Sequence, residues 1–567
     1  MERSVLLKVL RSVVSNGLAL LGAWGLLQVV KTLIQGRAPG SVDWSIRASA
    51  GAEGRTVAEL VRQNLGHTVE LLVAALVVAA LLAAAHMALF WRSSRPESGG
   101  VLRAVRSLWL DFWMSASPFY LNFMMLFVFA IWLGVLPSGS APRDAGLATR
   151  LYHLLLPALA LAIVPAMLLT SKGLREMEAR QSFTAGRPRR LLLAHLALFM
   201  GAEALRMVGL LLALAAFVEG RSISASLLAA AAWAQDAPVV VGLAWVLAVM
   251  VVVSRLLADM VHIGDEQLLQ RVGVAGGAPS DQERPSRRVA SIPLWMGLVV
   301  FGGLGVLALF SPWTAGYNPL AASLRDRMLS PSLSHLLGTD YVGRDLFSRL
   351  VHGLRFELLI ALIVLGGAAV FSAPWSALVV WLRGKSGWPW QLGHEAAMWP
   401  IHVLTAFPWT ALAALVIVYN YGVPGVESRG QAGDISMYIA VLLLLLVPRG
   451  VKMCVECFDA TSTSLRLHQR AVASAAVLVP MVTAAAIFLS VTMSGPSMGF
   501  LGLAAPRPSL GNISMEMRDY LGTTAWVTKV VVPLVGVLLV ASLLWMGEYL
   551  QDRMRMQSGS IWSRGLE

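Results

Sequence analysis

The densest set of chemically active side chains in the sequence lies at residues 335 to 355, HLLGTDYVGRDLFSRLVHGLR, between two long apolar stretches. An aspartate before a helix accepts hydrogen bonds from its free backbone N–H groups, and oppositely charged residues three or four positions apart pair on a helix. We therefore expect Asp340 to cap a short helix that runs into the next apolar stretch. Arg344, Asp345 and Arg349 are then expected to pair locally. Direct contact with a substrate is the alternative.

Four further charged residues lie within apolar stretches. Glu203 and Arg206 are three positions apart, and Arg255 and Asp259 are four positions apart. Charges inside a membrane are costly and mark functional sites by default. At these spacings, however, opposite charges share one face of a helix. We expect each pair to neutralise itself along its own helix or to lie at the membrane interface. A substrate path is the alternative.

The composition places these charged groups in a membrane protein. Of the 567 residues, 57% are hydrophobic and only 14% are charged, against roughly 25% charged residues in soluble domains. Apolar runs of about 20 residues, long enough to cross a hydrocarbon core of about 30 Å, recur along the chain. The sequence thus excludes a soluble enzyme and predicts an all-α, polytopic membrane protein.

No nucleotide, metal or other cofactor site is expected. Gly384-Lys385-Ser386 lacks the glycine that a phosphate-binding loop needs five positions earlier, where Val379 stands. The single Cys-x-x-Cys pair lacks the second pair of ligands that a zinc site requires. We expect no catalytic residue in this chain.

Twelve apolar segments are candidate membrane helices, centred near residues 22, 78, 123, 161, 203, 249, 301, 368, 408, 444, 482 and 536. With the N-terminus inside, more than half of the 45 Lys and Arg residues fall in the expected cytoplasmic segments. Positive residues are enriched on the cytoplasmic side, so both termini are expected there. Their attraction to anionic lipid headgroups, about 1 kcal/mol per residue, explains the basic charge without a nucleic acid partner.

A polar stretch with two glycines in a row, prolines and many charges follows the sixth expected helix. It predicts a cytoplasmic linker at residues 264 to 290. The linker would separate a first half, residues 1 to 263, from a second half, residues 291 to 567. Each half would contain six helices in the same orientation, an arrangement found both in fused transporter permeases and in secondary carriers.

The segment at residues 335 to 355 resembles the signature of the second permease subunit of dipeptide, oligopeptide and nickel ABC importers. The matching positions are His335, Gly338, Thr339, Asp340, Gly343, Arg344, Asp345, Ser348, Arg349, Gly353 and Arg355. A second match to the same family lies at residues 498 to 526. Its matching positions are Phe500-Leu501-Gly502-Leu503, Pro506, Pro508, Gly511, Asn512, Arg518, Asp519, Tyr520 and Leu521, with Leu510 where the family has tryptophan. The resemblance implies that both motifs lie on the external side.

The first half resembles the partner permease subunit of the same importers through shorter signals. These are Ala38-Pro39-Gly40, Ser117-Pro118-Phe119, Gly134-Val135-Leu136-Pro137, and His153 followed by Leu156-Pro157-Ala158. Their order along the chain carries more information than any one of them. The resemblance therefore implies a fused permease in which both subunits share one polypeptide.

The resemblance also implies two cytoplasmic coupling helices, each with Glu-Ala-Ala, three residues and then Gly, that dock on ATPase subunits. Both are altered here. In the first, Glu178 and Ala179 precede Gly186 by too many residues; in the second, Asp459, Ala460 and Thr461 stand in place of Glu-Ala-Ala and Leu465 replaces the glycine. Arg187 is a candidate contact for an acidic partner, and positive-inside placement explains it equally well. Each segment is also shorter by roughly ten residues, a loss of about 15 Å of helix. Either the ATPases dock close to the membrane or coupling has been lost.

These features lead to the following functional hypothesis. The chain is expected to be the permease of an ATP-driven importer for peptides or a related small solute in the bacterial cytoplasmic membrane. By resemblance, its partners are two ATPase subunits and an extracytoplasmic solute-binding protein. A permease-derived membrane scaffold that has lost ATPase coupling is the alternative, and a secondary carrier is a third possibility.

Overall fold

The computed structural model describes most of the chain. The described residues are 2–35, 57–94, 99–179 except 117 and 143, 189–271 except 219 and 232–236, 291–452 except 386, 422–438, 441 and 445, then 455, 508–515 and 526–564. They form helices joined by turns and loops, with one isolated β-bridge and no strand among them.

Seven of the described helices are long and apolar enough to cross a membrane. They are α1 (Glu2–Gln35), α2 (Val57–Phe90), α5 (Leu147–Ala179), α9 (Ala237–Arg271), α10 (Ile292–Leu309), α12 (Leu346–Arg383) and α19 (Trp526–Arg564). About 20 residues at 1.5 Å each suffice for the hydrocarbon core. The apolar parts of α10 and α19 are 18 residues long and only approach this length, whereas the other five candidate spans exceed it with ample margin. The all-α, polytopic class predicted from the sequence is confirmed.

Two bent pairs of helices raise the number of candidate spans to as many as nine in the described part of the chain. One pair is α6 (Arg189–Arg206) with α7 (Val208–Val218), bent by 42°. The other is α13 (Trp388–Ala406) with α14 (Trp409–Tyr421), bent by 92°. Pro408 lies at the second break, where it cannot donate a backbone hydrogen bond. These nine segments coincide with nine of the twelve expected centres.

The other three expected spans differ in outcome. Near residue 123 the chain forms the short helix α4 (Pro118–Met125) and a π-helical piece η2 (Leu126–Trp132), and Gly134 with φ +63° follows two residues later. The segment centred near 444 is described only in part, and the one near 482 lies outside the described residues. Helix α9 continues to Arg271, so the first residues of the expected linker are helical, and residues 272 to 290 lie outside the described chain.

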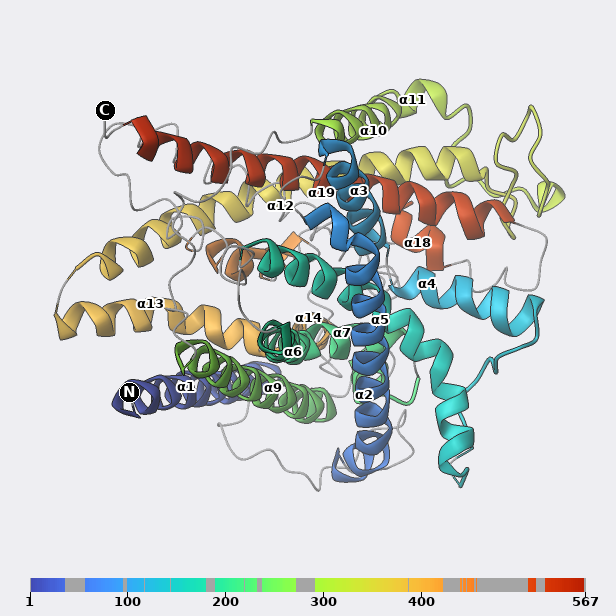
Figure 1. Cartoon of the computed structure of the whole chain (residues 1–567). Helices are drawn as coiled ribbons and strands as arrows, with labels where there is room; N and C mark the ends of the chain where they lie inside the picture. The colour runs from blue at the N-terminus through green and yellow to red at the C-terminus, as the bar shows by residue number, and fades with distance from the viewer. Residues whose placement is uncertain are drawn as a thin grey trace.

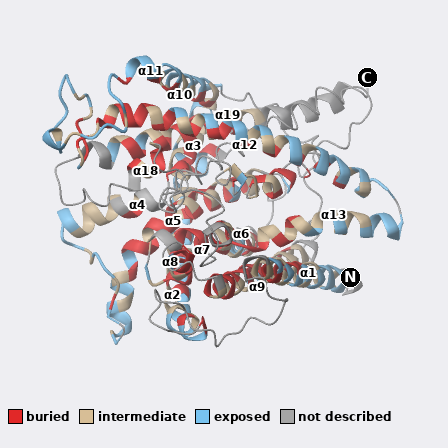
Figure 2. Ribbon diagram, turned by 180° about the vertical axis from the view of Figure 1, so that it is seen from behind, coloured by how far each residue is buried: buried red, intermediate tan, exposed pale blue. Residues whose placement is uncertain are grey.

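Several long helices expose large apolar side chains along their length. On α12, Leu362 is 71% exposed and Val370 is 68% exposed, and on α10 Val299 is 71% exposed. Figure 2 shows such pale blue surface on α1, α10, α12 and α13. An apolar surface this extensive would be a liability in water, whereas lipid covers it without cost.

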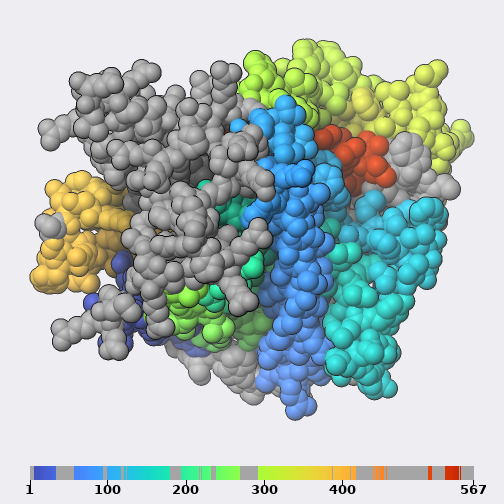
Figure 3. Space-filling model, viewed as in Figure 1, coloured from blue at the N-terminus to red at the C-terminus, as the bar shows by residue number. Residues whose placement is uncertain are grey.

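Helices from before and after the expected linker pack together. Helix α1 contacts α9 and α13, α14 contacts α9, and α3 (Gly100–Ser115) contacts α10 and α19. A single cluster of buried side chains joins Leu211 and Leu247 to Leu354 and Leu412. In Figure 1, α2 and part of α5 cross the direction in which α12, α13 and α19 run. Figure 3 shows the first half, with α2 in blue beside the segments in cyan, along one face of the molecule.

The contact between α1 and α13 depends on a glycine. A Cβ atom added to Gly22 would lie 2.2 Å from Cγ2 of Val403 and 2.7 Å from the Trp399 ring. The Trp399 indole N–H donates to the Leu18 carbonyl at 3.0 Å. Small residues let helix backbones approach closely in membranes, where packing replaces the hydrophobic effect as the driving force. Gly22 thus allows the first and second halves to meet.

We predict that Gly22→Val destabilises the protein by about 1–3 kcal/mol, because overpacking forces helices apart. The measurement is the unfolding temperature of the full chain in lipid nanodiscs. Gly25→Val is the matched control, since Gly25 has nothing within 4 Å of an added Cβ and lies on the same helix. Equal unfolding temperatures for the two variants would contradict the assigned contact.

Candidate functional site

Asp340 is the centre of the first family motif, residues 335 to 355. Its carboxylate is fully buried and accepts hydrogen bonds from Arg344 Nε and Arg349 Nη1, both at 2.6 Å. It also accepts from the backbone N–H groups of Val342 at 3.0 Å and Arg344 at 2.8 Å. Two guanidinium groups and two amides therefore surround one negative charge, which offsets the large cost of burying it.

The cap of helix α12 is Asp345, so the expectation that Asp340 caps this helix is wrong. Asp345 accepts from the backbone N–H of Ser348 at 2.7 Å and from His335 Nδ1 at 2.9 Å. The His335 ring stacks on Tyr317 with centroids 4.8 Å apart. The expected local pairing of Arg344, Asp345 and Arg349 differs in its partners. Both arginines pair with Asp340 and Asp345 pairs with His335, because Asp345 directly precedes the helix and Asp340 lies within the turn.

Two glycines let the loop fold back on itself. Gly338 and Gly343 have φ of +77° and +81°, values that side chains disfavour. A Cβ atom on Gly343 would lie 1.8 Å from the Ser323 carbonyl oxygen, and one on Gly338 would lie 2.3 Å from that of Leu329. Both positions therefore require glycine for two independent reasons, backbone conformation and lack of space.

Hydroxyl groups fasten the loop to the preceding segment. Thr339 accepts from the backbone N–H of Leu329 at 2.9 Å and donates to the Asp326 carbonyl, and Ser348 donates to the Ala315 carbonyl. Arg355, one helical turn or more beyond these groups, is exposed on α12. The motif residues up to Arg349 thus form one closed structural unit, whereas Arg355 lies outside it.

The two family motifs meet at Gly353. A Cβ atom there would lie 3.3 Å from the backbone nitrogen of Leu510 and 3.3 Å from the carbonyl carbon of Ser509. Leu510 begins the short helix α18 (Leu510–Met515), and the Ser509 hydroxyl accepts from the backbone N–H of Asn512 at 3.1 Å. Figure 1 shows α18 beside α12 and α19. The remaining residues of the second motif, apart from Pro508 and Gly511, lie outside the described chain.

Hydrogen bonds also join the short first-half motifs to neighbouring residues, where the structure describes them. His153 Nδ1 lies 2.6 Å from the Gly139 carbonyl oxygen, and the Tyr152 hydroxyl donates to the Val135 carbonyl at 2.5 Å. These contacts tie the start of α5 to the turn that follows η2. Residues 38 to 40 and residue 117 lie outside the described chain.

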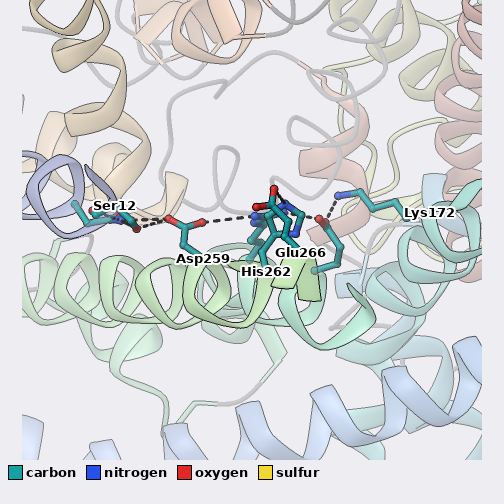
Figure 4. A network of polar contacts seen from close by, with 8 residues as sticks. Ser12, Lys172, Asp259, His262 and Glu266 are labelled. Atoms are coloured by element: carbon teal, nitrogen blue, oxygen red, sulfur yellow. Dashed lines mark hydrogen bonds and ion pairs between the residues drawn. The ribbon is translucent and has the colours of Figure 1, made fainter. Parts of the chain in front are cut away.

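The charged residues inside the apolar helices form a network that crosses between helices (Figure 4). Arg206 Nη1 binds Glu203 at 2.7 Å on its own helix, as the spacing predicts. Glu203 also pairs with Lys172 of α5, and Arg206 Nη2 reaches Asp259 of α9 at 3.5 Å. Asp259 accepts from the Ser12 hydroxyl of α1 at 2.7 Å. One continuous network of polar contacts therefore joins the four helices α1, α5, α6 and α9.

Arg255 was expected to pair with Asp259 along α9, but its hydrogen bonds reach another helix instead. Arg255 donates through Nη1 to the Thr405 hydroxyl at 3.3 Å and through Nη2 to the Thr405 carbonyl, both on α13. The sequence spacing did not reveal these partners because they lie 150 residues away. Arg255 thus joins the first half to the second.

Of the coupling candidates, only Glu178 has a described side chain. Arg106 Nη1 of α3 donates to Glu178 Oε1 at 2.7 Å, in a largely buried pair. Ala179 is the last residue of α5. Gly186, Arg187, Asp459, Ala460 and Thr461 lie outside the described residues. Within the described chain, no group of three or more His, Cys, Asp or Glu side chains is arranged to hold a metal ion.

We predict that Asp340→Asn lowers the free energy of unfolding by about 3–5 kcal/mol, because Arg349 keeps a buried charge whose partner is gone. The measurement is thermal unfolding in nanodiscs. Asp326→Asn is the control, since this carboxylate accepts from the Ser323 hydroxyl at 2.6 Å and has no ion pair in the described chain. Adding Arg349→Gln to Asp340→Asn should recover part of the loss. An unchanged unfolding temperature in Asp340→Asn would contradict the central role of Asp340.

Comparison with known proteins gives relatives of one kind. No protein-family model matches the chain. The di/tripeptide transport system permease protein DppC of Pseudomonas aeruginosa (strain UCBPP-PA14) is 32% identical over 275 residues, which cover 46% of this chain and 84% of that protein. The dipeptide transport system permease protein DppC of Escherichia coli K12 is 29% identical over 274 residues, 45% of this chain and 86% of that protein.

A third relative matches a shorter region at higher sequence identity. The nickel transport system permease protein NikC of Escherichia coli K12 is 44% identical over 63 residues, which cover 11% of this chain and 23% of that protein. All three relatives are permease proteins of transport systems. The chain belongs to the permease family of the dipeptide, oligopeptide and nickel ABC importers, as a membrane-spanning subunit of such an importer.

Proposed function

We propose that this chain combines two permease subunits in one polypeptide and forms the path for di- or oligopeptides between its two halves. The observation that carries this proposal is the extent of the match to DppC, which covers 84% of that protein but only 46% of this chain. One chain therefore has the length of two such subunits. The boundaries we propose are residues 1 to 263 and 291 to 567, with the linker between them.

The contacts between the halves support a single functional unit. Helix α1 packs on α13 at Gly22, Arg255 donates to Thr405, and α3 packs on α10 and α19. Polar groups in a membrane are satisfied by partners on neighbouring helices, so such contacts hold spans in register. A path between the halves would open alternately to either side when they rock against each other.

The choice of peptides as substrate rests on the relatives. Two of the most similar curated proteins are named for dipeptide or di/tripeptide transport, and a third is named for nickel transport. Within the described chain no metal-binding group of side chains occurs, which gives no specific support to nickel. We therefore favour peptides as the substrate class.

The proposed partners are two ATPase subunits and an extracytoplasmic solute-binding protein, in the bacterial inner membrane. The orientation we propose has both termini in the cytoplasm. In Figure 1 the N-terminus and the connection from α12 to α13 lie on the left, and the external motif lies on the right. This arrangement agrees with a cytoplasmic left side on which ATPases would dock, near the ends of α5 and α6.

A membrane scaffold without ATPase coupling is not favoured, because the relatives are transport permeases. The altered coupling segments at residues 175 to 196 and 459 to 465 remain its only support. A shallow dock, in which the ATPases approach the membrane closely, explains the shortened segments and preserves transport.

We predict peptide uptake into proteoliposomes that contain the full chain and its co-purified partners, dependent on ATP and on the solute-binding protein. The measurement is accumulation of a radiolabelled dipeptide. Replacement of ATP by a non-hydrolysable analogue is the control and should abolish uptake. Accumulation driven by an ion gradient without ATP would instead indicate a secondary carrier, and no accumulation with ATPases bound would favour another substrate.

We further predict that the linker can be cut without loss of uptake, because the halves hold together through helix contacts. A protease site is inserted after Pro279, within the proposed linker, and cleaved in the assembled complex. The two fragments should co-purify and retain most of the ATP-dependent uptake of the uncut protein. Separation of the fragments in mild detergent would refute the proposed division into two halves.

A further inference from the structure

His195 lies between two carboxylates from different helices. It belongs to α6 and is 1% exposed. Its Nδ1 atom lies 2.7 Å from Oδ1 of Asp265 on α9, and its Nε2 atom lies 3.1 Å from Oε1 of Glu176 on α5. The Asp265 side chain is 3% exposed and that of Glu176 is 20% exposed. Both ring nitrogens thus face carboxylate oxygens in a nearly dry environment.

This geometry requires one proton more than the ordinary ionisation states provide. A neutral imidazole carries a single N–H group, and an ionised carboxylate has no hydrogen to donate. Two hydrogen bonds therefore need either a doubly protonated ring or one carboxylic acid. Without the extra proton, one ring lone pair would face a negative oxygen at 2.7 or 3.1 Å. Such an unpaired contact is costly when buried.

We propose that Glu176, His195 and Asp265 form a proton-binding site whose bound proton holds α6 against both α5 and α9. The site can be occupied in two ways, with the proton on the ring or on a carboxylate. In each case the two hydrogen bonds are complete. Loss of the proton would leave one of the two helix contacts repulsive.

The surrounding charges are engaged in other contacts. On α5, Lys172 pairs with Glu203, and Glu178 pairs with Arg106 of α3. Arg175 also lies on α5 and takes part in an interaction, as do Glu176 and His195 beyond the contacts given above. On α6 itself, Arg206 pairs with Glu203 and Asp259.

The same holds for the other helices packed against α6. On α9, Glu266 pairs with Lys8 of α1, and His262 Nε2 lies 3.8 Å from Glu266. On α2, His86 Nδ1 lies 2.7 Å from the Leu82 carbonyl oxygen. Helix α7 carries no charged residue. Four of the named cations, Lys8, Arg106, Lys172 and Arg206, thus pair with carboxylates outside the triad.

The position of the site gives it a mechanical consequence, which rests on the proposed function. The central part of the first coupling segment, residues 180 to 188, follows Glu176 and precedes His195 in the sequence. The triad therefore joins the two helices that flank this segment and fixes them to α9. A proton bound there would set the position from which the segment reaches an ATPase.

The test uses the full chain in lipid nanodiscs and needs no transport activity. In ¹⁵N-histidine spectra, the ring signals that disappear in His195→Gln identify this residue. We expect either two protonated ring nitrogens or one protonated nitrogen together with a carboxylic acid signal in ¹³C spectra. A singly protonated ring with both carboxylates ionised would overturn the proposal.

A second measurement separates proton binding from simple packing. As pH is raised, the unfolding temperature of the native protein should fall when the proton is lost. Glu176→Gln should remove this dependence, because a neutral amide can complete its hydrogen bond without an added proton. Glu178→Gln, the same change two residues away, should retain it, since Glu178 faces Arg106.

An unchanged pH profile in Glu176→Gln would refute the assignment. Because neither measurement depends on substrate or ATP, a negative result here is distinct from a failure of the proposed transport function.

Discussion

The cost of placing charge inside an apolar bundle is the constraint on which the rest of the structure depends. Isolated charges in a membrane cost several kcal/mol, so each one needs a partner on a nearby helix. The chain meets this requirement with contacts between helices: Lys172 with Glu203, Arg206 with Asp259, and Arg255 with Thr405. These contacts determine which helices lie together and in what register.

The two sides of the molecule use charge differently. The motif at residues 335 to 355 concentrates its charges within one loop, where Asp340 and Asp345 are satisfied by neighbours a few residues away. Such a loop is rigid by itself. The network on α1, α5, α6 and α9 joins distant segments instead, so that a change at one helix end bears on the others. The motif thus depends on local contacts, whereas the helix network depends on contacts between distant segments.

The sequence predicted features that depend on local spacing. Long apolar runs revealed nine of the spans, and the spacing of Glu203 and Arg206 revealed their pair. It misassigned the cap because Asp340 and Asp345 are equally plausible before the structure shows where α12 begins. The partners of Arg255, Asp259 and His195 lie on other helices, and a single sequence carries no signal for them. The helical segment near residue 123 covers only residues 118 to 132, and this short extent was not predicted because hydrophobicity does not reveal helix ends.

The central claim is that one chain supplies both permease halves of an importer. Native mass spectrometry of the complex purified from its own membrane tests it most directly. The account predicts one copy of this chain with two ATPase subunits. A complex with two copies of this chain, or one without any ATPase, would contradict it.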